Sequence, residues 1–431
     1  MDMLVLGGVG IAVLLAFLML IGLEIGWSLG VAATVGLVFY VDQPLSILGD
    51  IAFSAVNSFT LTAMALFILM GSILGNTGIN RKMFNAIEKW VGGLPGGLAC
   101  SVIFGNAVFG AMCGSVIAAT ATFGKLAYPV MEEREYSPRL ALGSIASGTI
   151  LSPLIPPSLL LIIYGAWQGL SIVDLLSAGV VPGILLTVLL IITVLVWAKV
   201  NPESAPPVQQ HTMQEKIGAI VDILPFVGLI AAVLGSIFSG IMTPTEASAL
   251  GVLFSFLLTV YYKCMNWKIF KVCLMETVKV SAFSLMIMAM ANVLTHVYNS
   301  AGIILMLKDV IMGLPVGRTG ILLLLVGMYL VMGTFLGSWT MLFLTFPFVI
   351  PILEAMDVNL IWWGIIYVLA AEQSSLTPPF GLTLFVLKNV VPKHSIATIF
   401  MGCLPFLIPI YITVILLFFF PEIVMWLPNR L

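Results

Sequence analysis

Apolar runs of membrane-spanning length recur along the chain. The longest cover about 3–22, 58–78, 176–198, 218–239, 245–262, 280–299 and 396–420. Because about 20 apolar residues in a helix are needed to cross the hydrocarbon core of a bilayer, each run predicts a transmembrane helix. Shorter runs, interrupted by glycine or proline, lie between them. The pattern predicts an all-α polytopic membrane protein.

The second half of the chain repeats the pattern of the first. An offset of 222 positions places "SPLIPPSLLLIIYG" (152–165) on "SSLTPPFGLTLFVL" (374–387), with both proline pairs aligned. One further residue of offset aligns "FGAMCGS" (109–115) with "VMGTFLGS" (331–338). Repetition at a fixed offset indicates a duplicated structural unit. We therefore divide the chain into two copies of one unit.

The two copies cover 1–200 and 218–431, and a cytoplasmic linker over 201–217 joins them. The linker contains "NPESAPPVQQHTMQEK", a long polar, proline-rich segment between apolar runs. Such a composition is typical of a connection outside the packed structure. Each copy is predicted to hold three spans, a pair of half-length runs, a proline-broken span and a final span.

The half-length runs predict two re-entrant helical hairpins, at about 98–130 and 319–353. Each arm is too short for a comfortable crossing, and the arms meet at Gly114 and Gly337. Five predicted spans separate the two hairpins. Because five is odd, the hairpins would enter the membrane from opposite faces, which makes the two copies an inverted-topology repeat.

The distribution of basic residues gives an independent prediction of orientation. With the N-terminus outside, only Lys308, Arg318 and Arg430 of the 17 Lys and Arg residues fall on the outer side. Cytoplasmic loops carry the excess of Lys and Arg in membrane proteins. We therefore expect both termini on the periplasmic side. The amphipathic segments 81–90 and 303–313 are predicted to lie along the membrane surface, where they could link a stationary part to a moving part.

Prolines at membrane depth indicate a binding site. The broken spans are predicted at about 139–168 and 360–391. A proline inside a helix removes a donor and frees the carbonyl group four residues earlier. The carbonyl groups freed by this rule belong to Thr149, Ser152, Pro153, Ser374 and Ser375. A single proline pair is more often a tolerated kink, but the recurrence beside each hairpin favours an ion site at the repeat interface.

Sodium is a natural partner for freed carbonyl groups together with hydroxyl groups. The N-termini of the second hairpin arms add amide donors and a positive dipole, which suit an anion. We expect no Arg or Lys near either tip, since Lys125 lies ten residues after Ser115, about 15 Å along a helix. Bound sodium and amide dipoles would then balance an anion held between the tips.

Composition excludes several other classes. Hydrophobic residues make up 61% of the 431 residues and charged residues only 8%, so a soluble protein is excluded. The net charge of −2 gives no basic surface for nucleic acid. The five cysteines and three histidines show no metal-binding or disulfide spacing. The N-terminal run lacks a basic segment and a cleavage site, so we expect it to be retained as a span.

Five motifs carry a resemblance to a known family. They read "GNTGINRKMF", "CGSVIAATATFGKLAYPVM", "GTILSPLIPPSLLLIIYG", "TPTEASAL" and "LTPPFGLTLFVL". In their order and spacing the chain resembles the large membrane (M) subunit of tripartite ATP-independent periplasmic (TRAP) transporters, within the ion-transporter superfamily. The resemblance implies an elevator-type transporter, not an enzyme. It would couple sodium to the uptake of a small organic anion, a carboxylate or a sulfonate, across the bacterial inner membrane.

The resemblance also implies partners and site residues. The partners are a small four-helix (Q-type) membrane subunit and a periplasmic (P-type) substrate-binding protein; sodium is the coupling ion and no other cofactor is expected. The first sodium site maps to Cys113, Gly114, Ser115, Val116, Gly148, Leu151 and Pro153. The second maps to Gly337, Thr377, Phe380 and Thr383. Substrate contacts are expected from Ser115, Ser152, Ser338 and Trp339.

Several alternatives stay open at this point. Glu372 lies inside the second broken span, where an acid is either functional or a hydrogen-bonded structural carboxylate. A stand-alone sodium/carboxylate symporter would need no binding protein. A membrane-embedded enzyme is disfavoured because no nucleophile and base pair is evident. A channel is disfavoured because hairpins entering from opposite faces suit alternating access.

Overall fold

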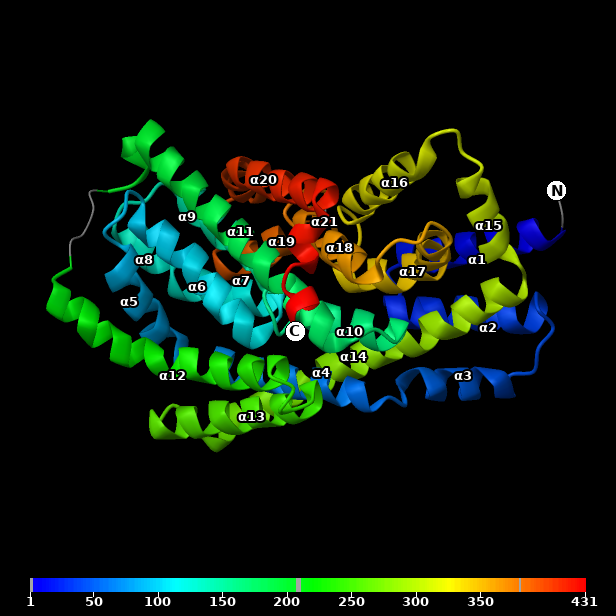
Figure 1. Ribbon diagram of the computed structural model, residues 1–431, viewed down its shortest axis with the longest axis horizontal. Helices are drawn as coiled ribbons and strands as arrows, with labels where there is room; N and C mark the ends of the chain where they lie inside the picture. Colours follow the sequence, from blue (N-terminus) through cyan, green and yellow to red (C-terminus); the bar gives the residue numbers. More distant parts are fainter. Residues whose placement is uncertain (1–2, 207–210, 380) are drawn as a thin grey trace.

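The structure is a computed structural model that describes residues 3–206, 211–379 and 381–431 (Figure 1). The regular elements in these ranges are all helices, which confirms the all-α prediction. The helices of the first half are α1 Met3–Leu20, α2 Ile25–Phe39, α3 Ser46–Val56, α4 Phe59–Asn76, α5 Asn80–Val91, α6 Gly97–Cys113, α7 Val116–Leu126, α8 Tyr128–Glu133, α9 Pro138–Gly148, α10 Leu159–Gln168 and α11 Ile172–Val200.

The helices of the second half follow in an order similar to that of the first. They are α12 Met213–Phe238, α13 Pro244–Tyr261, α14 Trp267–Ser300, α15 Ile303–Met312, α16 Gly317–Met332, α17 Ser338–Ala355, α18 Leu360–Ser374, α19 Leu382–Val390, α20 Ile396–Phe419 and α21 Pro421–Met425. Short 3₁₀ turns cover Thr149–Leu151, Pro202–Ser204 and Pro428–Arg430. Both the half-length runs and the proline-broken runs of the sequence therefore form pairs of shorter helices.

Seven described helices have the length and apolar composition needed to cross a membrane. They are α4, α11, α12, α13, α14, α17 and α20. Two of them begin five or more residues earlier than the apolar runs predict. Helix α12 begins at Met213, because Thr212 and Glu215 form a capping box in which Glu215 Oε2 accepts a hydrogen bond from the Thr212 amide at 2.8 Å. The last five residues of the expected linker are therefore helical.

Helix α14 begins at Trp267, and the prediction of its start near residue 280 was wrong. Four charged residues interrupt the apolar pattern in its first half, so the apolar run begins later than the helix does. They are Lys268, Lys271, Glu276 and Lys279. At 1.5 Å per residue its 34 residues span about 51 Å, more than the roughly 30 Å hydrocarbon core of a bilayer. The charged first half thus makes α14 longer than an ordinary transmembrane helix.

The helices pack in two groups. Helices α1–α4 and α12–α14 contact one another in one group, whereas α6–α11 and α16–α20 contact one another in the second. The two groups touch directly where α4 packs against α6 and α10 and where α14 packs against α17. Helices α5 and α15 also link them, since α5 contacts α12 and α6, and α15 contacts α14 and α17. Figure 1 shows α5 and α15 towards opposite ends of the molecule, each near its own hairpin, α6–α7 or α16–α17. The inverted relation of the two halves stays a prediction.

Two of the contacts that join the halves within the second group show how closely the halves fit. Lys393, between α19 and α20, donates to Glu132 of α8 at 2.6 Å, and this bond holds the pKa of the Glu132 carboxyl below its usual value. Helices α9 and α20 approach each other backbone to backbone. A Cβ placed on Gly143 would lie 2.1 Å from the Gly402 carbonyl oxygen, and one on Gly402 would lie 2.2 Å from the Arg139 carbonyl oxygen. Only glycine fits at this crossing.

We expect the substitution Gly402→Ala to destabilise the protein, because the new methyl group must push α9 and α20 apart. The cost of such overpacking is about 1–3 kcal/mol. The matched control is Gly228→Ala in α12, where a Cβ would have no neighbour within 4 Å. There alanine should be neutral or stabilising, since it favours helix more than glycine. Thermal unfolding of the purified variants in detergent measures both effects. A midpoint for Gly402→Ala that is no lower than that of Gly228→Ala would contradict the packing argument.

Candidate functional site

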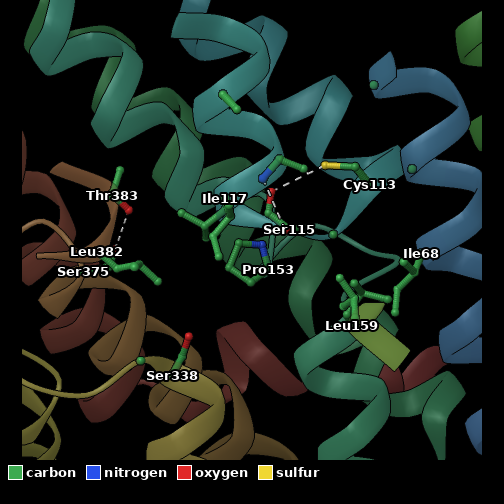
Figure 2. A pocket seen from close by; sticks show the side chains of 18 of the residues that line it. Ile68, Cys113, Ser115, Ile117, Pro153, Leu159, Ser338, Ser375, Leu382 and Thr383 are labelled. Atoms are coloured by element: carbon green, nitrogen blue, oxygen red, sulfur yellow. Dashed lines mark hydrogen bonds between the residues drawn. The ribbon is translucent and has the colours of Figure 1, made fainter. Parts of the chain in front are cut away.

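One cavity of about 1460 Å³ lies where the two hairpin tips and the two broken helices meet. Both tips contribute to its wall, and α4 and α14 of the other packing group close it. Figure 2 shows Ser115 and Pro153 of the first half near one another, with Ser338 of the second half across from them. Ser375, Leu382 and Thr383 complete this side of the wall. Residues far apart in sequence thus share one chamber.

The first tip is built by a glycine and a serine. Gly114 ends α6 with φ of 58°, a left-handed conformation that favours glycine. Ser115 caps α7, with its hydroxyl oxygen accepting from the Ala118 amide at 3.4 Å. A Cβ on Gly114 would lie 2.7 Å from the Pro157 carbonyl oxygen, so the tip touches the broken helix directly. The amide end of α7 therefore faces the break in the neighbouring helix.

In the first break, two carbonyl groups that the helical rule for proline predicts to be free accept hydrogen bonds within local turns. The Thr149 carbonyl accepts from the Ser152 amide at 3.0 Å. The Pro153 carbonyl accepts from the Ser158 hydroxyl. The prediction that both are free was therefore wrong, because the chain leaves the helical path at the prolines and forms turns with new donors. Each carbonyl oxygen still has a second lone pair.

The second break behaves in the same way. The Ser374 carbonyl accepts from the Thr377 amide at 3.0 Å, and the Ser375 carbonyl accepts from the Thr383 amide at 3.2 Å. The prediction that these two are free was also wrong. Side-chain oxygens gather here instead, with the hydroxyl oxygens of Ser375 and Thr383 3.0 Å apart. Thr383 is buried and lines the cavity.

The second tip is tied to its broken helix by a carboxylate. Ser338 donates its hydroxyl to Glu372 Oε1 at 2.7 Å, and the Tyr367 hydroxyl donates to the Ser338 carbonyl. Glu372 is only 4% exposed, although it lines the cavity. A buried carboxylate needs hydrogen-bond donors to offset its lost hydration. Glu372 therefore ties the second tip to its broken helix and lines the cavity as well.

The structure brings most of the expected site residues to the cavity wall. Those that line it are Cys113, Gly114, Ser115, Val116, Pro153, Gly337, Ser338, Trp339 and Thr383. Four others do not line it: Gly148, Leu151, Ser152 and Thr377. The first three of these are buried in the packing behind the wall. Phe380 lies outside the described residues.

Two buried amide oxygens lie beside expected residues that do not line the cavity. A Cβ on Gly148 would lie 2.9 Å from Asn106 Nδ2, and the Gln373 amide nitrogen donates to Thr377 Oγ1 at 3.0 Å. Asn106 Oδ1 and Gln373 Oε1 accept no hydrogen bond from the described part of the chain. An unpaired acceptor in a membrane interior is costly, and a cation or a water can satisfy it. Sequence patterns gave no signal for either amide.

The cavity wall also contains an acid that the sequence patterns missed. Glu276 of α14 accepts from the Ser72 hydroxyl at 2.5 Å and from the Asn76 amide nitrogen at 2.7 Å, both on α4. All three residues line the cavity. The apolar-run analysis placed Glu276 outside a span because it started α14 too late. The polar positions Ser72 and Asn76, four residues apart within an apolar run, were an available signal of a polar helix face.

Three basic residues line the same cavity: Arg81, Lys125 and Lys279. The tips themselves carry no Arg or Lys, as expected, but the chamber extends far enough from them to reach these three. The expectation that an anion in this chamber would face no basic side chain therefore holds only at the tips.

Comparisons with known proteins identify similar chains. The family model described as "Tripartite ATP-independent periplasmic transporter, DctM component" matches residues 12–423. The sialic acid TRAP transporter large permease protein SiaM of Vibrio cholerae serotype O1 is 30% identical over 417 residues, which cover 96% of this chain and 96% of SiaM. The isethionate TRAP transporter permease protein DctMQ of Oleidesulfovibrio alaskensis is 29% identical over 376 residues, covering 87% of this chain and 59% of DctMQ.

A solved structure shares the fold. The YdaH transporter of Alcanivorax borkumensis superimposes with a TM-score of 0.61, covering 88% of this chain and 89% of YdaH. The sequence identity of that match is 14%, so it supports the fold alone.

We expect the Ser338–Glu372 contact to stabilise the second tip. Replacing either partner with alanine, as Ser338→Ala or Glu372→Ala, should lower the free energy of unfolding, because an intramolecular hydrogen bond contributes about 0.5–1.5 kcal/mol. The double variant should lose less than the sum of the two single losses. Titration with sodium dodecyl sulfate in mixed micelles measures all four proteins. Strictly additive losses would show that the two side chains do not interact.

Proposed function

This chain belongs to the DctM component family of the tripartite ATP-independent periplasmic (TRAP) transporters, and from that premise we propose that it couples sodium to the uptake of a small organic anion by an elevator movement. Members of this family are transporter permeases and not enzymes. The chain is accordingly a multi-pass membrane protein of the secondary transport class. The coupling ion, the movement and the site are the parts that we propose.

The observation that carries the proposal is the shared cavity. Both hairpin tips, both broken helices and the opposing helices α4 and α14 form its wall. Transporters built from related halves hold substrate and coupling ions near the membrane midplane, where broken helices offer amide and carbonyl groups. The tips here present two helix N-termini to the chamber, at Val116 and Ser338. Helix N-termini bind anionic groups through free amides and the helix dipole.

The donor types near the expected sodium sites suit a hard cation. Around the second break these donors are hydroxyl, amide and carbonyl oxygens from Ser375, Thr377, Thr383 and Gln373. Around the first they are the tip backbone from Cys113 to Val116 and the Asn106 amide oxygen. Sodium takes oxygen ligands and needs no carboxylate cluster. We propose that these residues hold one cation at each break.

The anion class follows from the relatives. The names of SiaM and DctMQ give sialic acid, which is a carboxylate, and isethionate, which is a sulfonate. The cavity wall here combines helix N-termini with hydroxyl groups, which can bind either group. Trp339 lines the wall beside the second tip and would contact the apolar part of such a substrate. We therefore propose a small carboxylate or sulfonate as the substrate.

The two packing groups suggest how the site would move. Helices α6–α11 and α16–α20, which carry both tips, would travel as one body, while α1–α4 and α12–α14 stay fixed. Helix α5 is held on both sides: Trp90 Nε1 donates to the Lys216 carbonyl at 3.0 Å, and Glu88 pairs with Arg134 at 2.5 Å. Lys216 belongs to the fixed group and Arg134 to the moving one. Helix α5 would thus act as a connecting arm, with α15 as its counterpart.

The family implies partners for this permease. We propose that a small four-helix Q-type subunit and a periplasmic P-type substrate-binding protein work with it, with both termini on the periplasmic side. The alternative is a stand-alone symporter without a binding protein. The two differ in whether the binding protein is required for uptake.

We expect uptake into proteoliposomes to need sodium and the binding protein. The vesicles hold this chain with its small subunit, and the acid is chosen by a thermal-shift screen of carboxylates and sulfonates on the matching binding protein. Replacing external sodium with choline should abolish uptake, because an anion between the tips faces no Arg or Lys there and needs bound cations for charge balance. Persistent uptake in choline would refute the coupling. Undiminished uptake without the binding protein would favour the stand-alone symporter.

We expect Thr383→Val to weaken sodium activation. Valine keeps the volume but removes an oxygen at the second break, so the sodium concentration for half-maximal uptake should rise roughly tenfold, the equivalent of one hydrogen bond of about 1.4 kcal/mol. The matched control is Thr413→Val in α20, whose buried hydroxyl donates to the Pro409 carbonyl away from the cavity. The control should leave sodium activation unchanged. Equal shifts in both variants would argue against a cation at this break.

A further inference from the structure

We propose that Arg81, Lys125 and Lys279 form an electropositive antechamber in which a small organic anion is held between the hairpin tips and the solvent. The ligand class, a small carboxylate or sulfonate, rests on the proposed function. The antechamber itself rests on the placement of the three side chains in the cavity wall.

The three bases come from three separate elements. Arg81 lies at the start of α5, Lys125 near the end of α7 and Lys279 in the first half of α14. All three line the cavity and are exposed. None of them forms an ion pair within the described part of the chain. Three like charges that share one chamber without a paired acid produce a positive potential there.

The acids in the cavity wall are used by other partners. The two that line it are Glu276 and Glu372. Glu276 is held against α4 by Ser72 and Asn76, and Glu372 accepts from Ser338 at the second tip. The wall thus has three bases and two acids, and both acids are bound to neutral donors instead of bases. The bases remain available to a mobile anion.

The antechamber is distinct from the space between the tips. Lys125 lies ten residues after Ser115 on the same hairpin arm, about 15 Å along the helix. The cavity of about 1460 Å³ also exceeds the roughly 300–1,000 Å³ of a typical pocket for a drug-sized ligand. A small organic acid therefore has room at either position. An anion that leaves the tips would meet the three bases before it reaches the solvent.

Two of the bases lie on different packing groups. Lys125 belongs to the proposed moving body, and Lys279 belongs to the fixed helix α14. Arg81 lies on the connecting arm α5. If the body moves, the distance between Lys125 and Lys279 changes, so the antechamber would be complete in only some positions of the body. This inference links release of the anion to the position of the hairpin.

The experiment measures the local potential with charged thiol reagents and needs neither sodium nor the natural substrate. A cysteine is introduced as Ala121→Cys, which lines the cavity one turn before Lys125. The background carries Cys113→Ser and Cys264→Ser, because Cys113 lines the cavity and Cys264 is partly exposed. The purified protein reacts in detergent with sulfonatoethyl methanethiosulfonate, an anion, or trimethylammonioethyl methanethiosulfonate, a cation. The same protein without Ala121→Cys measures nonspecific labelling, which is subtracted.

The ratio of anion rate to cation rate should fall roughly tenfold in the triple variant Arg81→Gln, Lys125→Gln, Lys279→Gln, because three nearby charges act with opposite sign on the two reagents. The matched control removes three exposed lysines that do not line the cavity, as Lys199→Gln, Lys268→Gln, Lys271→Gln. It should leave the ratio within about twofold, since those charges are screened. An unchanged ratio in the first triple variant, or no reaction with either reagent, would overturn the antechamber.

A competition arm tests whether the chamber holds an anion as well as attracting one. Potassium isethionate should slow the anionic reagent more than potassium chloride at equal ionic strength, and this difference should vanish in the triple variant Arg81→Gln, Lys125→Gln, Lys279→Gln. Equal slowing by both salts would overturn the holding role. Because no sodium is present, loss of these effects is distinguishable from failure of sodium-coupled uptake.

Discussion

Every backbone amide and carbonyl group at membrane depth needs a hydrogen-bond partner, and the centre of this molecule is arranged around that need. An unpaired group in hydrocarbon costs several kcal/mol on an order-of-magnitude scale. The chain nevertheless leaves the helical path in both broken spans, after Leu151 and after Ser374. It does so where turns supply new donors and the hairpin tips exclude lipid. The breaks, the tips and the cavity are therefore parts of one arrangement.

The two halves meet this need by different local means. The first tip uses a left-handed glycine and a serine cap, with Gly114 in contact with the Pro157 carbonyl. The second tip uses a side-chain carboxylate, since Ser338 and Glu372 join it to its broken helix. A glycine at 337 has no side chain to cap α17, so the contact falls to its neighbour Ser338. Similar sequence motifs thus produce two chemically different ends of the chamber.

Much of the fold could be predicted from the sequence, because apolar runs mark the helices and glycine or proline residues mark where those helices end or break. Hairpin arms and broken spans were placed within a few residues of α6, α7, α16 and α17 and of the helices on either side of each break. The start of α14 was not predictable from apolar runs, since four charged residues interrupt its first half and two of them, Glu276 and Lys279, line the cavity. The contacts of Ser72 and Asn76 with Glu276 join residues about 200 positions apart, and no local pattern contains them. The bonds that use the Thr149 and Ser374 carbonyls depend on turn geometry, which the helical rule for proline does not describe.

The backbone contact between α9 and α20 restricts which sequence changes the two halves can accept. Gly143 and Gly402 come from different halves, yet neither position accepts even a methyl group unless the other helix shifts. The two halves are therefore fitted to each other at this crossing, and neither could be exchanged for the corresponding half of a distant homologue without a matching glycine. This contact therefore makes the two halves complementary parts that must change together.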